Sequence, residues 1–201
     1  MLPLEPWRAA LGGLSVAMAF VAFAIYGWQT IVGPVRPHPL SWFLFGVLSA
    51  IGYWVQRDEG AHAGSWVLLS MVLFCFLLSA AGFVRGERRF PLREWGFLAA
   101  ACVVLLIYLL TREPTLAAIL ITVIDALGYG PTYSRGWSHP RKDSATSFAL
   151  NGAKFAPSLL AMNPVSLATC LYPATLLCLN VAVTMMLLLR RRALANSEIA
   201  A

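Results

Sequence analysis

Charge is scarce in this chain, and the scarcity decides its class. Only 12% of its 201 residues are Asp, Glu, Lys or Arg, whereas a soluble domain carries about 25%. The charged residues are also clustered, so that several long stretches contain none, and 59% of all residues are hydrophobic. This composition excludes an ordinary soluble domain and predicts a chain that lies within a lipid bilayer.

Seven stretches of the chain are long and apolar enough to be membrane-spanning helices. A span needs roughly 17–25 apolar residues to cross about 30 Å of hydrocarbon, and five uncharged stretches meet this requirement. Two more qualify except for one charge each, Asp125 and Lys154. Because lipid offers the backbone no hydrogen bonds, we expect every span to be an α-helix. The predicted spans are 9–34, 40–56, 63–84, 95–111, 115–134, 144–163 and 165–189.

The sequence also lacks the common signatures of catalysis and metal binding. It has no phosphate-binding loop, no glycine pattern for a dinucleotide and no nucleophile elbow. Its four cysteines all fall within predicted spans and show neither metal-site nor disulfide spacing. We therefore expect no catalytic residue, no metal, no cofactor and no enzymatic activity.

The net charge of +6 is explained by membrane orientation rather than by a nucleic-acid partner. If the C-terminus is inside, eleven Lys and Arg residues fall in inside segments and three fall outside, which is a strong positive-inside bias. The N-terminus is then outside, and the compact loops suit a bacterial inner membrane. The inside residues are Arg36, Arg85, Arg88, Arg89, Arg93, Arg135, Arg141, Lys142, Arg190, Arg191 and Arg192, and the outside ones are Arg8, Arg57 and Arg112.

Two segments of the chain are versions of each other. The segment Tyr26–Thr30 precedes the sequence Ser-Trp-Phe-Leu-Phe-Gly at 41–46, and Gly128–Thr132 precedes Ser-Phe-Ala-Leu-Asn-Gly at 147–152. An internal repeat of this kind predicts two related structural units. The fourth span is left over as a linker, which returns the second unit to the orientation of the first. The predicted class is an all-α integral membrane protein with two parallel three-helix bundles and a linker helix.

The corresponding boundaries follow the spans. The first unit is 1–89, the linker segment is 90–113 and the second unit is 114–192. A cytoplasmic tail, 193–201, is expected to be short and frayed.

These features resemble the SWEET and PQ-loop superfamily, which includes the related vitamin-precursor transporters. The chain is similar to a divergent member, because the Pro-Gln pair of that family is split into Gln29-Thr30 and Pro131-Thr132. A second helix-breaking proline, Pro157, also occurs only in the second unit. The resemblance implies that these five residues act as hinges while the two bundles alternate access to a small solute.

The two charges within spans are the first candidates for a substrate site. Asp125 and Lys154 both lie near the middle of their spans, where each charge costs at least about 2.5–3.5 kcal/mol. One interpretation is a structural salt bridge between them, or separate polar contacts. The other is a substrate contact or a proton-coupling site, because ionisable residues within a membrane are usually functional.

Three more polar residues complete the predicted site. Asn151 is three positions before Lys154 and shares its helix face. Asn180 aligns with Ser79 in the repeat, and the resemblance implies that this pair of positions clasps the substrate. Each asparagine could instead hold neighbouring helices together.

Tryptophans near span ends are expected to form interfacial belts. Of these, Trp28 and Trp54 could instead stack on a ligand ring.

The predicted function is transport of a small polar solute such as a sugar, a vitamin precursor or an amino-acid-like compound. The predicted partners are this solute and the lipid bilayer, with a homo-oligomer left open. One alternative is a receptor or sensor that binds without transporting. Another is a retinal photoreceptor, although Lys154 is in the sixth span rather than the last.

Overall fold

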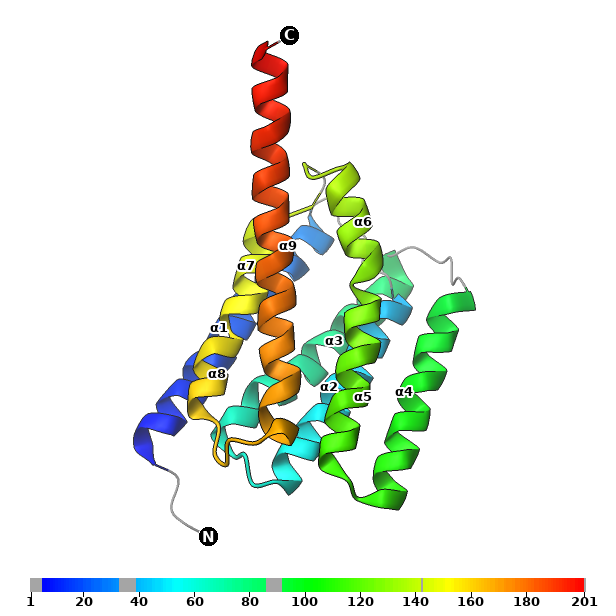
Figure 1. Cartoon of the computed structure of the whole chain (residues 1–201), viewed down its shortest axis with the longest axis vertical. Coiled ribbons are helices and arrows are strands. Elements are labelled where there is room, and N and C mark those ends of the chain that lie inside the picture. Colours follow the sequence, from blue (N-terminus) through cyan, green and yellow to red (C-terminus); the bar gives the residue numbers. More distant parts are fainter. Residues whose placement is uncertain (1–4, 33–38, 86–91, 142, 201) are drawn as a thin grey trace.

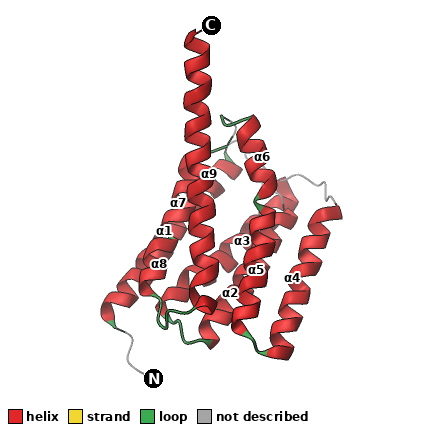
Figure 2. Cartoon of the chain, viewed as in Figure 1, coloured by secondary structure: helices red, strands yellow, loops and turns green. Residues whose placement is uncertain are grey.

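A computed structural model of the protein describes residues 5–32, 39–85, 92–141 and 143–200. The described residues form helices and loops without a strand, which confirms the all-α class (Figure 2). The helices pack side by side, with the N-terminus at one end of the bundle and the C-terminus at the other (Figure 1). They are α1 (Pro6–Ile31), α2 (Pro39–Asp58), the short 3-10 helix η1 (Ala63–Ser65), α3 (Trp66–Arg85), α4 (Leu92–Thr111), α5 (Pro114–Gly128), α6 (Gly130–Ser138), α7 (Ala145–Ala153), α8 (Phe155–Ala161) and α9 (Leu167–Ala200).

Among the described residues, four helical segments are long and apolar enough to cross a membrane, so the chain is a helical integral membrane protein. They are Pro6–Ile31, Ala63–Val84, Pro114–Ser138 and Leu167–Asn196, and Trp95–Thr111 is a shorter apolar helix. The predicted spans 40–56 and 144–163 are not among the four. The first is α2, which carries polar residues such as Ser49 and Gln56, and the second is divided into the short helices α7 and α8.

Two breaks divide the helices of the second half of the chain. One is the turn at Tyr129 between α5 and α6, and the other is at Lys154 between α7 and α8. Pro131 and Pro157 follow these breaks closely. Proline has no N–H to donate and its ring crowds the carbonyl one turn earlier, so each proline weakens the helix at that turn.

Helix α9 has a proline near its start, and side-chain hydrogen bonds support the first turns of the helix. Ser166 and Thr169 cap the helix reciprocally, because each side-chain oxygen accepts a hydrogen bond from the other's backbone N–H. Pro173, inside α9, cannot donate to the carbonyl of Thr169. The side-chain amide of Gln56 on α2 donates to that carbonyl instead, at 2.7 Å. The freed backbone group thereby joins α2 to α9.

The C-terminal tail is not frayed, so this expectation was wrong. Helix α9 continues to Ala200 and extends beyond the rest of the bundle (Figure 1). No glycine or proline follows Pro173 in the helix, and Ala, Leu and Arg, which favour helix, make up most of its last turns.

The helices pack in an order that differs from their order along the chain. In the first half, α3 packs against both α1 and α2, and the rings of Phe23 and Tyr26 on α1 also meet that of Trp42 on α2. In the second half, α9 packs against α5 on one side and against α7 and α8 on the other. The two halves meet where α1 packs against α7 and α8, and where α2 packs against α5. Helix α4 packs against α2 and α5.

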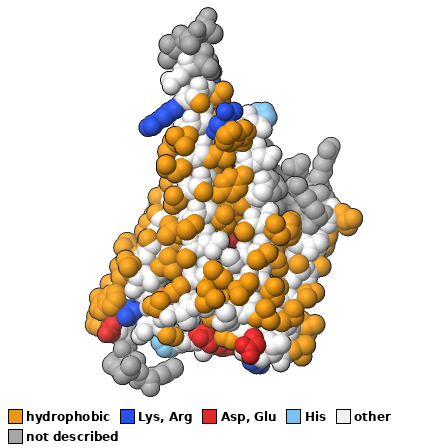
Figure 3. Space-filling view, in the orientation of Figure 1, with side chains coloured by type: hydrophobic (Ala, Val, Ile, Leu, Met, Phe, Trp, Pro, Cys, Tyr) orange, Lys and Arg blue, Asp and Glu red, His pale blue; other side chains and the backbone are white. Residues whose placement is uncertain are grey.

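Charged side chains gather at the two ends of the bundle, while apolar side chains cover its flank (Figure 3). One end, here called the acidic end, holds Glu5, Asp58, Glu59 and Glu113 together with Arg8, Arg57 and Arg112. The opposite, basic end holds Arg141, Arg190, Arg191 and Arg192. Arg36, Arg88, Arg89 and Lys142, which were assigned to the inside, lie outside the described residues. An apolar flank between two charged ends is the surface that a bilayer requires.

Candidate functional site

Asp125 is a buried carboxylate in the last turn of α5, halfway along the segment that α5 and α6 form. Its side chain is 3% exposed. The hydroxyl of Tyr172 on α9 approaches the carboxylate. The carboxylate oxygen Oδ1 has no hydrogen-bond partner among the described residues. Leaving a buried acceptor without a partner costs about 1–3 kcal/mol and more for a charged group, so this oxygen is a place where a ligand could be stabilised.

Lys154 is a buried ammonium at the break between α7 and α8. Its side chain is 1% exposed, and its Nζ donates a hydrogen bond to Oδ1 of Asn151 at 3.0 Å. This contact agrees with the helix face that the spacing predicts. Nζ also lies 4.8 Å from the ring centre of Phe23 and 5.3 Å from that of Phe155. Aromatic faces attract a cation, but they leave its remaining N–H donors without acceptors.

The two buried charges do not pair with each other. Within the described ranges, the salt bridge that forms joins Glu5 to Arg8, far from Asp125 and Lys154. Helix α5 packs against neither α7 nor α8. Cys75 on α3 is close enough to interact electrostatically with both charges. The interpretation of a direct salt bridge was therefore wrong, because the helices that carry the two residues are held apart.

These residues form a central polar cluster, defined here as Ser49, Cys75, Asp125, Asn151, Lys154 and Tyr172. Ser49 on α2 lies beside Tyr172, and its Oγ is buried without a hydrogen-bond partner in the described part of the chain. Gly52, one turn further along α2, presses against the same tyrosine, since a Cβ there would lie 2.9 Å from Cδ1 of the ring. The cluster thus draws on α2, α3, α5, α9 and the α7–α8 break.

Asn180 and Ser79 occupy different surroundings, although the repeat aligns them. Nδ2 of Asn180 donates to the hydroxyl of Tyr129 at 2.8 Å and to the carbonyl of Leu176 at 2.7 Å. Oγ of Ser79 donates to the carbonyl of Pro39 at 2.8 Å, which ties α3 to the start of α2. The structure therefore brings Asn151 to Lys154 but places Ser79 in a contact between helices.

The predicted hinge residues lie at or near helix ends. Thr30 is buried and its Oγ1 donates to the carbonyl of Tyr26 at 3.0 Å, while Gln29 and Thr132 are half-buried. Pro157 is buried beside the α7–α8 break. The side chain of Pro131 is outside what the structure describes.

The two tryptophans considered for ligand stacking are on the outer surface. Trp28 is 67% exposed and Trp54 is 50% exposed, so neither lines the central polar cluster. Their positions fit an interfacial belt.

Four residues near the two charges were missed by sequence reasoning, namely Ser49, Cys75, Tyr129 and Tyr172. A signal existed for Tyr172, because a tyrosine hydroxyl inside a span needs a polar partner. Cys75 was noted only for lacking metal-site and disulfide spacing, and nothing in the sequence places it beside the charges. Groups of three or more His, Cys, Asp or Glu side chains that could hold a metal ion do not occur among the described residues.

No protein-family model matches the chain, and no curated protein or solved structure is significantly similar to it. Function is therefore inferred from the chain's own residues and their arrangement.

Proposed function

We propose that the protein transports a small polar solute by alternating access, with the central polar cluster as its binding site. The observation that carries the proposal is the pair Asp125 and Lys154. Both are buried halfway along the bundle, both lie beside helix breaks, and neither is neutralised by the other. Buried charges within a membrane are retained for function, and broken helices at that depth are where transporters bind their solutes.

The packing order supports two related units of three helices. In the proposed repeat, α1, α2 and α3 correspond to α5, α7–α8 and α9, and the third helix of each unit packs against both of the others. The contact of α1 with α7–α8 then corresponds to the contact of α5 with α2. Two such units, related by an axis along the membrane normal and joined by α4, form the arrangement that the resemblance to SWEET and PQ-loop transporters implies.

Aligned glycines support the same correspondence at the level of side chains. A Cβ at Gly46 on α2 would lie 2.9 Å from the ring of Phe76 on α3. A Cβ at Gly152 on α7 would lie 3.0 Å from Cβ of Asn180 on α9. The repeated glycine therefore allows the second helix of each proposed unit to approach the third closely.

The bonds between the proposed units suggest which side is closed. Four side-chain hydrogen bonds between described residues cross from one unit to the other, and all lie between the depth of Lys154 and the acidic end. They join Arg8 to the carbonyl of Met162, Ser15 to that of Lys154, Gln56 to that of Thr169, and Ser158 to that of Gly64. Towards the basic end, by contrast, a separate apolar cluster of Ala145, Val183 and Leu187 packs within the second unit alone. Since the positive-inside rule makes the acidic end external, the described conformation is closed to the outside.

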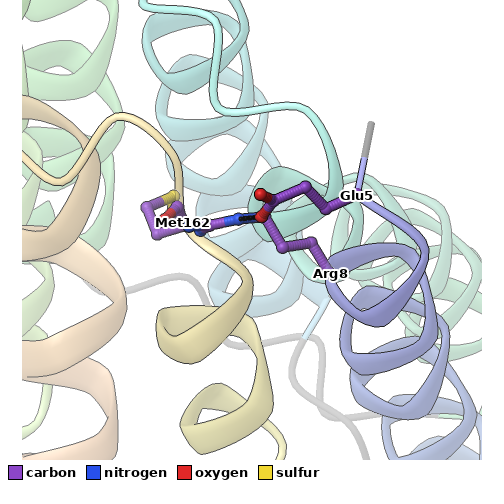
Figure 4. Close-up of polar contacts among 3 residues, drawn as sticks. All are labelled: Glu5, Arg8 and Met162. Carbon is purple, nitrogen blue, oxygen red and sulfur yellow. Dashed lines mark hydrogen bonds and ion pairs between the residues drawn. The ribbon is translucent and has the colours of Figure 1, made fainter. Parts of the chain in front are cut away.

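Arg8 makes the outermost of these contacts. Its Nη1 donates to the carbonyl of Met162 at 2.7 Å, while its Nε pairs with Glu5 at 2.7 Å (Figure 4). The guanidinium thus joins the start of α1 to the end of α8. Opening to the outside requires this contact to break.

The test is uptake by purified protein in liposomes. Sugars, nucleosides, vitamin precursors and amino acids are screened first by thermal shift, since a ligand that binds the folded state raises its melting temperature. Flux of each hit is then compared for the wild type, Asp125→Asn and the control Glu113→Gln, which changes an exposed carboxylate just before α5. We expect flux to be lost in Asp125→Asn and kept in the control. Equal flux in both folded variants would remove Asp125 from the mechanism.

A receptor that binds without transporting is the second candidate. Helices α1 and α2 of the first unit are continuous over 26 and 20 residues, whereas the breaks fall in the second unit. A rigid first unit suits a binding scaffold as well as a transporter. Binding without flux in the same liposomes would favour this candidate.

A further inference from the structure

We infer that the solute is a small zwitterion, whose cationic group is bound by Asp125 and whose anionic group is bound by Lys154. This inference rests on the proposed function, because it names the chemical class of the solute at the same site. It follows from the separation of the two buried charges.

The carboxylate of Asp125 requires a hydrogen-bond donor that carries positive charge. Its Oδ1 is unpartnered, and the described groups that approach it most closely, such as the hydroxyl of Tyr172, are neutral. Neutral donors do not replace the hydration that a buried carboxylate has lost. A primary or secondary ammonium supplies both the missing hydrogen bond and the opposite charge.

The ammonium of Lys154 requires a hydrogen-bond acceptor that carries negative charge. It has three N–H donors, and it makes one hydrogen bond, to the neutral amide oxygen of Asn151. The rings of Phe23 and Phe155 cover part of it and offer no lone pair. A carboxylate or similar oxyanion would accept the remaining hydrogen bonds and balance the charge.

One ligand must serve both groups, because the protein keeps them apart. Helix α5 does not pack directly against α7 or α8, and Cys75 of α3 lies within electrostatic range of each charge. A solute with one charge would leave the other buried charge alone, and a sugar would leave both alone. A zwitterion pairs each of them and adds no net charge to the interior, which lowers the cost of burial.

The experiment compares matched probes on the whole purified protein. Glycine, β-alanine and γ-aminobutyrate vary the separation between ammonium and carboxylate, and each is compared with the alkylamine and the alkanoate that keep one of the two groups. Glucose is the uncharged probe. Binding is measured by thermal shift and by titration calorimetry. We expect at least one amino acid to bind roughly 30-fold more tightly than its singly charged analogues, as is typical when a buried charge loses its partner.

Variants assign each end of the ligand to its residue. Asp125→Asn should reduce the affinity for the amino acid to that for the alkanoate, and Lys154→Met should reduce it to that for the alkylamine. Asp125→Glu keeps the charge and should retain the preference, which guards against an Asn variant that fails to fold. Stronger binding of glucose or of a singly charged probe than of every amino acid, or no binding by any probe, would overturn the inference.

The outcomes separate this inference from the transport proposal. Binding with the expected charge pattern but without flux would refute transport and leave zwitterion recognition intact. Flux of glucose without binding of any amino acid would refute zwitterion recognition and leave transport intact.

Discussion

At the scale of single residues, the second half of the chain uses its polar groups in two distinct ways. Asn180 satisfies its amide with Tyr129 and a backbone carbonyl, so it stabilises the contact between α9 and the α5–α6 break. Asp125 and Lys154 keep hydrogen-bonding capacity unused in the interior. This difference separates a structural polar contact from a candidate binding group.

The contact between Asn180 and Tyr129 can be measured by a double-mutant cycle. Tyr129→Phe and Asn180→Ala should each lower the free energy of unfolding, and their effects should couple by about 0.5–3 kcal/mol because the side chains share a hydrogen bond. Unfolding in mixed micelles gives the energies. The control pair, Tyr129→Phe with Asn151→Ala, has no such contact and should be additive. Additivity in both pairs would contradict the hydrogen bond.

At the scale of elements, close packing depends on small residues at particular helix positions. On α1, a Cβ at Gly12 would lie 2.5 Å from the carbonyl oxygen of Ala63, whereas a Cβ at the neighbouring Gly13 would meet nothing within 4 Å. Helix α1 can approach η1 this closely because position 12 has no side chain. Adjacent glycines therefore have different structural roles.

Alanine substitution at these two positions provides a matched test. Gly12→Ala should destabilise the protein by about 1–3 kcal/mol, since backbone must move to admit the methyl group. Gly13→Ala should be neutral or stabilising, because alanine favours helix more than glycine does. Thermal unfolding in detergent measures both. Similar melting temperatures for the two variants would show that α1 does not approach η1 as described.

At the scale of the whole molecule, the class and most helix positions could be predicted from the sequence. Long uncharged stretches locate the helices because hydrocarbon excludes charge, and the repeat predicts equivalent segments in two halves. The packing order could not be predicted from these local patterns, since it depends on which helices meet in space, as where α3 packs against both α1 and α2.

The candidate site was predictable only in part, for the same reason. Asp125 and Lys154 stand out as charges within apolar spans, and Asn151 follows from helical spacing. Their separation depends on which helices meet in three dimensions. The positions of Tyr172 and Ser49 beside each other depend on the contact between α2 and α9, which no local pattern encodes.

The proposed closure of the acidic end predicts a change in accessibility across the molecule. In a variant that retains only Cys75, after replacement of Cys102, Cys170 and Cys178 by alanine, a small thiol reagent added outside should react slowly. Arg8→Ala removes the bond to Met162 and should speed this reaction, because the outward-open state becomes more populated. Arg57→Ala, an exposed arginine at the same end, is the control. Equal rates in both variants would contradict a closing role for Arg8.

Flux through reconstituted liposomes tests the central claim most directly. The measurement is uptake of the solute that gives the largest thermal shift, compared between wild-type protein, folded Asp125→Asn and empty liposomes. The account predicts saturable uptake by the wild type, and uptake by Asp125→Asn close to that of empty liposomes. Binding without uptake by the wild type, or undiminished uptake by Asp125→Asn, would contradict it.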